Sequence, residues 1–271
     1  MIIGMDPVAF TLGTLQIRWY GIMVVLAVIA ILAISLIEAK RLNIKRDDVY
    51  NIAVFAIIGG VIFARVIHVI DQWEYYMSHP EQLLSFEGVG VYGAVIGVLL
   101  AIVIYCLVKK ISIWKIADMV SPGALVGMAI GRIGCTINGC CYGLETDSFC
   151  SVIYTNPNSY APLHVSVLPT QIFHVVWNLI AFGIIWAVRK KMKPDGTTFL
   201  LYLALYGAGD LIIRFFRDGT PFMFGMQQAQ VIGILILVIT VPWLITRMVL
   251  YRKKMKTEAL DEASKEKNPA G

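Results

Sequence analysis

The composition of this chain excludes an ordinary soluble domain. Its 271 residues are 58% hydrophobic and 15% charged, with a formal net charge of +5. Soluble domains carry about 25% charged residues. The apolar residues also occur in long blocks, so the sequence indicates a multispanning membrane protein. The basic clusters lie at the ends of these blocks, where membrane topology explains them, and nucleic acid is not an expected partner.

Seven apolar segments are long enough to cross a membrane as helices, which takes about 20 residues. They lie at residues 19–38, 51–71, 88–108, 112–133, 168–188, 197–217 and 226–250. Lys115, Asp118 and Pro122 interrupt the fourth, which predicts a segment that is short, kinked or packed inside the protein. We expect an all-α, polytopic fold. It comprises a single transmembrane domain at 1–251 with an outer loop at 134–168, and a short polar cytoplasmic tail at 252–271.

Lysine and arginine predict the orientation, because they accumulate in short cytoplasmic loops. Basic clusters follow the first, third, fifth and seventh segments, at residues 40–46, 109–115, 189–193 and 247–256. Residues 72–90, 134–168 and 218–227 contain neither lysine nor arginine. Seven spans then place the N-terminus outside and the C-terminus in the cytoplasm. Residues 1–13 lack the charged and apolar regions of a signal peptide, so we expect no cleaved leader.

The basic residues expected in the outer half of the membrane are all arginines. They are Arg18, Arg65, Arg132, Arg214 and Arg217. Arginine keeps its charge when buried, and its planar fork binds a phosphate or carboxylate bidentately. The set therefore favours anion recognition. For any single member, a helix cap, an interfacial position or a structural ion pair is an equal alternative.

The second and third segments contain features with simpler structural interpretations. His68 follows Arg65 by three residues, and a hydrogen-bonded structural histidine is the favoured interpretation. Small residues recur every three or four positions over 88–97. This spacing predicts close helix packing, with a groove for an acyl chain as the alternative.

Residues 131–143 read Gly-Arg-Ile-Gly-Cys-Thr-Ile-Asn-Gly-Cys-Cys-Tyr-Gly, which places a permanent cation among glycines. An anionic ligand would explain this combination. Cys135, Cys140, Cys141 and Cys150 also lie here or nearby. A structural disulfide, such as Cys135 or Cys140 with Cys150, or plain packing is the favoured interpretation, followed by a catalytic or redox thiol. Zinc is least favoured because paired Cys-x-x-Cys or histidines in register are missing, and we assign no metal ligand and no cofactor.

The outer loop ends at a predicted helix start. Residues 143–168 are polar and aromatic, which suits a lid or a peptide platform, with an ordinary connection as an equal alternative. Pro169 is well placed in the first turn of a helix. We therefore expect Gln171 to face the outer opening of the bundle.

The sixth segment contains an acid and two arginines on one predicted helix face. Asp210, Arg214 and Arg217 stand at positions i, i+4 and i+7. An unpaired charge in hydrocarbon is expensive, so we expect Asp210 and Arg214 to neutralise each other. Arg217 then remains available to a ligand.

These motifs resemble the phosphatidylglycerol:prolipoprotein diacylglyceryl transferases of bacteria, almost from end to end. Residues 131–143 resemble the family's Gly-Arg-x-Gly-Asn-x-x-Asn-Gly-x-x-x-Gly except at Cys135. Other similar stretches are Arg18 to Met23, Phe63 to Arg65, Tyr92 to Gly97, Pro169 to Gln171 and Tyr206 to Arg217.

The resemblance implies a seven-helix enzyme of the bacterial plasma (inner) membrane, with a catalytic cavity that opens outward and sideways to membrane lipid. Such an enzyme moves the diacylglyceryl unit of phosphatidylglycerol to the thiol of the lipobox cysteine in a preprolipoprotein signal peptide. The reaction forms a thioether and releases glycerol phosphate. The implied partners are therefore phosphatidylglycerol, the preprolipoprotein lipobox and membrane lipid.

The resemblance also implies roles for individual residues. Arg132 would hold the phosphate and stabilise the leaving group, with Arg217 and Arg65 assisting, while Asn138 and Tyr20 orient the headgroup. The expected catalytic residues are Arg132, Arg217 and Tyr92. The expected substrate-binding residues are Arg132, Asn138, Tyr20, Arg65, Gly134, Gly139, Gly143, Gln171, Asp210 and Arg214.

Three positions besides Cys135 depart from the family pattern. Tyr92 stands where the family has a histidine, and Asp210 and Arg214 replace an arginine and a glutamate. The exchange keeps an ion pair but moves the cation by one helical turn, about 5.4 Å. One alternative is therefore a paralogue that uses the outer cysteines for thiol redox chemistry. A membrane transporter is a further alternative, although we find no inverted repeat.

Overall fold

The chain forms eight helices within the described residues, which are 1–13, 15–79, 90–217, 219, 221–223 and 225–267 of the computed structural model. The molecule divides into two units. The larger unit comprises residues 1–34 and 120–271, and the smaller unit comprises residues 35–119. Each unit is described by itself.

Six helices are long and apolar enough to cross a membrane. They are α1 (Trp19–Leu42), α2 (Arg46–Asp71), α5 (Ile113–Asn138), α6 (Thr170–Val188), α7 (Thr197–Arg214) and α8 (Gln228–Lys267). The third predicted span corresponds to α4 (Val91–Lys109), a shorter apolar helix over its described side chains. Each predicted span thus overlaps one of the described helices, and the chain is a multi-pass membrane protein.

The smaller unit contains a tightly packed helix pair, α2 and α4, with the short helix α3 (Trp73–Ser78) after α2. A Cβ atom at Gly97 would overlap the backbone of Gly59, and one at Gly93 would overlap the carbonyl of Phe63. The prediction of close helix packing is therefore confirmed over residues 90–97, while residues 88 and 89 lie outside the described part of the chain. The same two helices also line an apolar groove of about 450 Å³ that includes Phe63 and Leu100.

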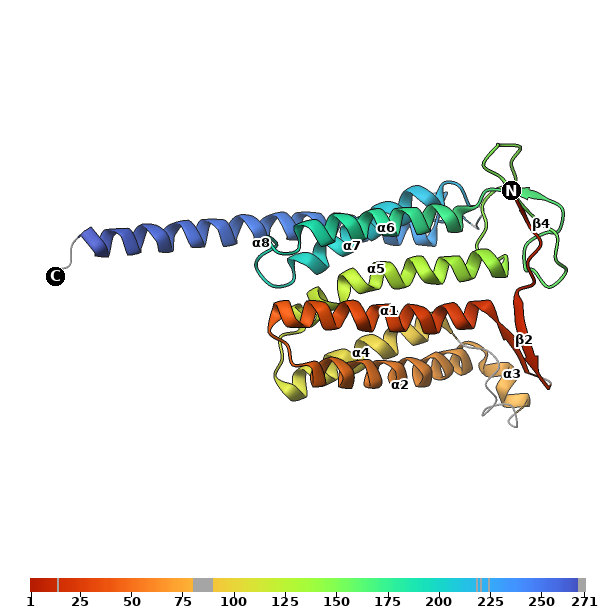
Figure 1. Cartoon of the computed structure of the whole chain (residues 1–271), viewed down its shortest axis with the longest axis horizontal. Coiled ribbons are helices and arrows are strands. Elements are labelled where there is room, and N and C mark those ends of the chain that lie inside the picture. Colours follow the sequence, from red (N-terminus) through yellow and green to blue (C-terminus); the bar gives the residue numbers. More distant parts are fainter. Residues whose placement is uncertain (14, 80–89, 218, 220, 224, 268–271) are drawn as a thin grey trace. The chain divides into compact units, whose positions relative to one another are not determined.

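The larger unit packs α5 against α1, α6 against α7, and α7 against α8. Gly123 and Gly127 of α5 lie against Ile31 of α1, where a Cβ atom would approach within about 3 Å. Leu125, Ala181 and Ile185 form an apolar core with flanking residues of α7. Figure 1 shows α7 alongside α8. The predicted irregular fourth span is one helix that contains Pro122.

Residues 139–168 fold back on the N-terminus. Strands β1 (Ile2–Ile3), β4 (Val152–Tyr154) and β5 (Ser166–Val167) form one sheet, in which β4 lies between the other two. Val152, Tyr154, Ala161 and Val167 form a buried cluster beneath it. The predicted outer loop therefore has a core of its own, which gives it a fixed shape.

Two further strand pairs flank helices of the larger unit. Strands β2 (Val8–Leu12) and β3 (Leu15–Arg18) form a hairpin that runs directly into α1. Strands β6 (Pro221–Met223) and β7 (Met226–Gln227) pair just before α8. The predicted polar tail is helical as far as Lys267, because it continues α8. The last turns of α8 extend past the ends of α6 and α7 (Figure 1).

Candidate active site

Arg132 lies on α5, less than two turns before the helix ends at Asn138. It is half-buried, and its guanidinium has no hydrogen-bonding or ion-pair partner among the described residues. A Cβ atom at the neighbouring Gly131 would meet no atom of the described chain within 4 Å. A partly buried arginine fork whose donors are not engaged within the described part of the chain is suited to binding an anion.

Asn138 is fixed by an arginine from β3. The Nη1 atom of Arg18 donates to Oδ1 of Asn138 at 3.0 Å and to the carbonyl of Asn158 at 3.4 Å. The Arg18 guanidinium also stacks over the Tyr160 ring at 4.5 Å. Arg18 therefore holds Asn138 at the end of α5.

The turn after α5 is held by the start of α6. Gly139 and Cys141 both have positive φ angles, of 72° and 64°, in the left-handed region. The Thr170 hydroxyl donates to the Cys141 carbonyl at 2.8 Å, and Nε2 of Gln171 donates to the Cys140 carbonyl at 2.7 Å. Gln171 is 0% exposed, so the expectation that it faces an outer opening is wrong. Its amide satisfies the backbone of the turn instead.

Gly143 joins this turn to the end of α7. Its N–H donates to the Leu168 carbonyl at 2.8 Å, and the next N–H, of Leu144, donates to the Phe216 carbonyl at 2.9 Å. A Cβ atom at Gly143 would lie 2.5 Å from the Phe216 oxygen. Only glycine allows this approach. Gly134 has a packing role too, since a Cβ atom there would lie 3.0 Å from Cβ of Met23.

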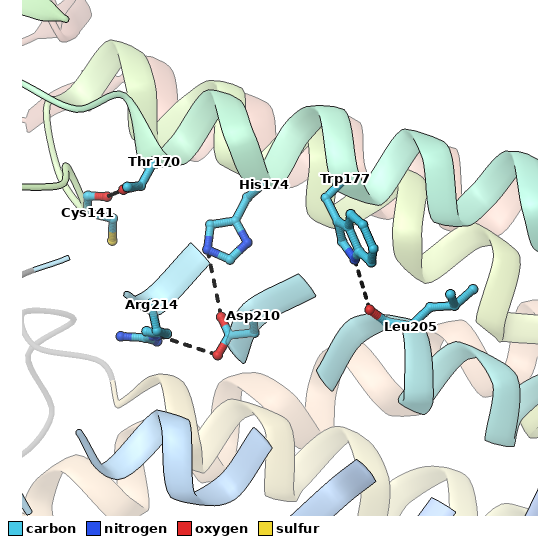
Figure 2. A network of polar contacts seen from close by, with 7 residues as sticks. All are labelled: Cys141, Thr170, His174, Trp177, Leu205, Asp210 and Arg214. Carbon is cyan, nitrogen blue, oxygen red and sulfur yellow. Dashed lines mark hydrogen bonds and ion pairs between the residues drawn. The ribbon is translucent and has the colours of Figure 1, made fainter. Parts of the chain in front are cut away.

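Asp210 connects α6 with the last turn of α7 (Figure 2). Its Oδ2 atom lies 3.4 Å from Nε of Arg214, which confirms the predicted ion pair. Its Oδ1 atom lies 3.7 Å from Nε2 of His174 on α6, and both of these facing atoms are buried without a hydrogen bond among the described residues. Asp210 therefore faces two partners from different helices.

Two residues near this group fasten α6 to α7. Figure 2 shows Trp177 projecting from α6 toward α7, where its Nε1 donates to the Leu205 carbonyl at 2.8 Å. Gly209 of α7 leaves room for the Trp177 ring, because a Cβ atom there would overlap the indole. This contact keeps Asp210 and His174 at the same level of the two helices.

Arg217 lies three residues beyond the end of α7, not on the helix as predicted. Its carbonyl accepts a hydrogen bond from Nε2 of Gln227 at 2.7 Å. Its Nε atom is buried and has no hydrogen-bond partner among the described residues. Burial lowers the pKa of Arg217, Cys141 opposes this shift, and the neighbouring charges of Arg214 and Arg132 reinforce it. An anionic ligand bound to the Arg217 guanidinium would therefore stabilise its partly buried charge and offset the repulsion from Arg214 and Arg132.

Three cysteine sulfurs gather in the same region. The Sγ atoms of Cys135, Cys140 and Cys141 all lie within 4.8 Å of one another. All the cysteines are free, and Cys150 is exposed, so the suggested disulfide with Cys150 does not form. Hydrogen bonds from Cys135 and Cys140 lower the pKa of the Cys141 thiol, and the charges of Arg217 and Arg132 lower it further.

The remaining predicted residues lie in different parts of the molecule. Tyr20, in the first turn of α1, interacts electrostatically with Arg132 and the three cysteines, so it belongs to this site. Arg65 belongs to the smaller unit, where its Nη1 donates to the Tyr76 hydroxyl at 3.1 Å and its guanidinium lies 5.1 Å from that ring. Tyr92 begins α4, and its side chain lies outside the described residues.

His174 is a site residue that the sequence analysis missed. It is 2% exposed and interacts electrostatically with Arg132, Arg217, Arg214 and Cys141. Gln171, His174 and Asn178 stand at i, i+3 and i+7, and all three are buried. A polar face with this spacing in an apolar segment is a detectable sign of a functional or structural network.

The fold and the site together define a multispanning helical membrane protein with a partly buried group of arginines. A family model described as prolipoprotein diacylglyceryl transferase matches residues 7–246. The chain belongs to this family.

Several curated relatives carry the name phosphatidylglycerol–prolipoprotein diacylglyceryl transferase. A relative from Dehalococcoides mccartyi is 43% identical over 258 residues, which cover 95% of this chain and 97% of the relative. A relative from Clostridioides difficile is 36% identical, covering 85% and 91%, and one from Clostridium tetani is 35% identical, covering 80% and 87%. None of these relatives favours a redox paralogue or a transporter.

Proposed function

We propose that this chain transfers the diacylglyceryl group of phosphatidylglycerol to the lipobox cysteine of a preprolipoprotein, forming a thioether and releasing glycerol phosphate. The observation that carries the proposal is the convergence of Arg132 and Arg217, from separate elements, on the turn at Cys141. Each guanidinium has buried or half-buried donor atoms without a partner among the described residues. Family membership supports the same reaction.

The reaction requires stabilisation of a departing phosphate. The lipobox sulfur forms a bond to the glycerol carbon that carries the phosphate, and the carbon–oxygen bond breaks. The electron pair of the broken bond stays on the phosphate oxygen, and glycerol phosphate departs. Arginines fixed at this oxygen before the reaction stabilise the charge that develops there. We assign this role to Arg132 and Arg217.

Other residues would position these groups. Asn138 and Tyr20 are assigned to the headgroup, and Arg18 holds Asn138 in place at 3.0 Å. Asp210 pairs with Arg214 at 3.4 Å, and this pair with His174 anchors the end of α7 that leads to Arg217. Gln171, Gly139 and Gly143 shape the turn beside Arg132. Tyr92 is our candidate for the group that removes the thiol proton, and Arg65 is our candidate for a further phosphate contact.

We also propose seven spans in the bacterial plasma (inner) membrane, with the N-terminus outside and the C-terminus in the cytoplasm. The α4 helix has 19 residues, about 28 Å at 1.5 Å per residue, which approaches the thickness of the hydrocarbon core. The basic clusters after alternate spans support the orientation. This topology places Arg132 and Arg217 near the outer surface, where a secreted substrate would present its lipobox.

Purified protein in phosphatidylglycerol vesicles with a lipobox peptide tests the reaction. We expect a diacylglyceryl thioether peptide by mass spectrometry, and no product in vesicles of phosphatidylethanolamine alone. Arg132→Lys should slow product formation by roughly 100-fold or more, because the bidentate fork is lost. Arg252→Lys, in the exposed end of α8, is the matched control and should retain the wild-type rate.

A folded wild-type protein that yields no thioether product would overturn the proposal. Solute flux through vesicles containing the protein, without lipid transfer, would instead support the transporter. The redox paralogue would be supported if the wild-type protein shows thiol redox activity but no lipid transfer, and the double variant Cys140→Ser with Cys141→Ser loses that redox activity.

A further inference from the structure

The three gathered cysteines have the dimensions of a metal site. Cys135 lies on the last turn of α5, and Cys140 and Cys141 follow in the turn, with all three sulfurs within 4.8 Å of one another. Three thiolates around one ion at about 2.3 Å lie about 4 Å apart when they are coplanar with it. Small side-chain rotations therefore bring all three sulfurs within bonding distance of one ion.

The backbone that carries these thiols is fixed in an unusual conformation. Cys141 has a φ of 64°, which residues with a Cβ atom rarely adopt. Two fully buried residues of α6 hold it there, with Thr170 and Gln171 donating to the carbonyls of Cys141 and Cys140. These hydrogen bonds hold the backbone from which the Cys140 and Cys141 thiols project. The three thiols are therefore carried on a backbone of fixed shape.

The surrounding charge suits a metal bound by thiolates. Three thiolates with a divalent ion carry a net charge of −1, and Arg132 and Arg217 lie close enough to act electrostatically on Cys141. These cations offset the excess negative charge. The group contains sulfur ligands alone, which select thiophilic ions over magnesium or calcium.

We propose that Cys135, Cys140 and Cys141 form a three-thiolate binding site for a thiophilic d10 metal ion such as zinc(II). The sulfurs bind as thiolates, so each thiol that is still protonated releases its proton on binding. No oxidation step is involved. The site is distinct in chemistry from the proposed lipid transfer, and its test does not depend on that activity.

Cadmium titration of the full-length protein in detergent, under a reductant that does not bind metal, tests the site. We expect a sulfur-to-cadmium absorbance band that saturates at one ion per chain, and displacement by zinc. We expect cadmium binding to weaken by roughly 100-fold or more in each of the variants Cys135→Ser, Cys140→Ser and Cys141→Ser. Mutating a residue that only supports a metal ligand typically lowers metal affinity about 10- to 100-fold, and these three residues are the ligands themselves. Cys106→Ser and Cys150→Ser are matched controls and should bind like the wild type.

A second measurement covers the case in which a serine variant fails to fold. In the wild-type protein, bound zinc should protect Cys135, Cys140 and Cys141 from alkylation while the exposed Cys150 still reacts. The proposal fails if intact reduced protein binds no cadmium, or if Cys141→Ser binds as tightly as the wild type. A disulfide between two of these sulfurs in protein isolated without oxidant would also overturn it.

Discussion

The α2/α4 pair and the polar site of α5, α6 and α7 use glycine for different purposes. In the pair, Gly59, Gly93 and Gly97 let two apolar helices approach until their backbones touch. In the site, Gly139 and Gly143 let a turn adopt a left-handed bend and contact the end of α7. The first arrangement depends on volume alone. The second also positions cations and thiols. We therefore expect substitutions in the two regions to have different effects on folding and activity.

The largest effect is expected in the helix pair. Gly97→Leu should prevent α2 and α4 from packing, because the new side chain would overlap the backbone of Gly59. We expect the yield of monodisperse protein in detergent to fall by about tenfold or more, since overpacking with a whole side chain exceeds what a core absorbs. Gly183→Leu is the control, because no described atom lies within 4 Å of a Cβ atom there. Equal yields of the two variants would contradict the packing interpretation.

Asp210→Asn should have the next largest effect. It removes the carboxylate shared by Arg214 and His174 and leaves the partly buried Arg214 guanidinium without its ion-pair partner, which costs about 1 to 3 kcal/mol. Thermal unfolding in detergent should show a clear fall in Tm. The exchanged pair, Asp210→Arg with Arg214→Asp, should recover part of this loss. A double variant no more stable than Asp210→Asn would show that the ion pair does not act as a unit.

Arg217→Lys should impair function while leaving the fold intact. We expect kcat/KM for thioether formation to fall roughly 100-fold, about 2.7 kcal/mol, because lysine cannot present a bidentate fork. The Tm should stay close to that of the wild type, in contrast to Gly97→Leu and Asp210→Asn. Arg247 and Arg252 lie in α8, and Arg252→Lys serves as the control for an arginine outside the site. An unchanged rate would remove Arg217 from the proposed phosphate contact.

The smallest effect is expected at Tyr154, where residues 139–168 contact α5. Its hydroxyl donates to the Thr136 carbonyl at 3.1 Å, so Tyr154→Phe should cost about 1 kcal/mol. Burial raises the pKa of Tyr154 from 10.0 to about 12, and Cys140 adds to the shift. The fold therefore favours the neutral phenol, and this stabilisation is complete below pH 10 and lost as the pH rises through 12.

Alkaline unfolding monitored by circular dichroism measures this dependence. Between pH 10 and about 12, the free energy of unfolding should fall more steeply for the wild-type protein than for Tyr154→Phe, which lacks the ionisable group. Tyr160→Phe is a matched control, since Tyr160 is exposed. Identical alkaline profiles for wild type and Tyr154→Phe would contradict the assigned pKa.

The apolar framework of this protein can be predicted from its sequence. Hydrophobic blocks of spanning length identified all the long helices, because lipid requires every backbone hydrogen bond to be satisfied within the segment. The spacing of small residues predicted the contact between α2 and α4, and the i, i+4 spacing predicted the pair of Asp210 and Arg214. These features depend on local periodicity, which is readable along a single chain.

Which polar groups meet depends on how the helices and turns pack against one another. His174 becomes a partner of Asp210 only because Trp177 and Gly209 fix α6 against α7. Gln171 turned out to be buried because the turn at Cys140 and Cys141 needs a hydrogen-bond donor. That turn also gathers three sulfurs whose spacing along the chain matched no zinc pattern. Contacts between elements depend on bends and long-range packing, and these are physical properties of the folded chain that periodicity does not encode.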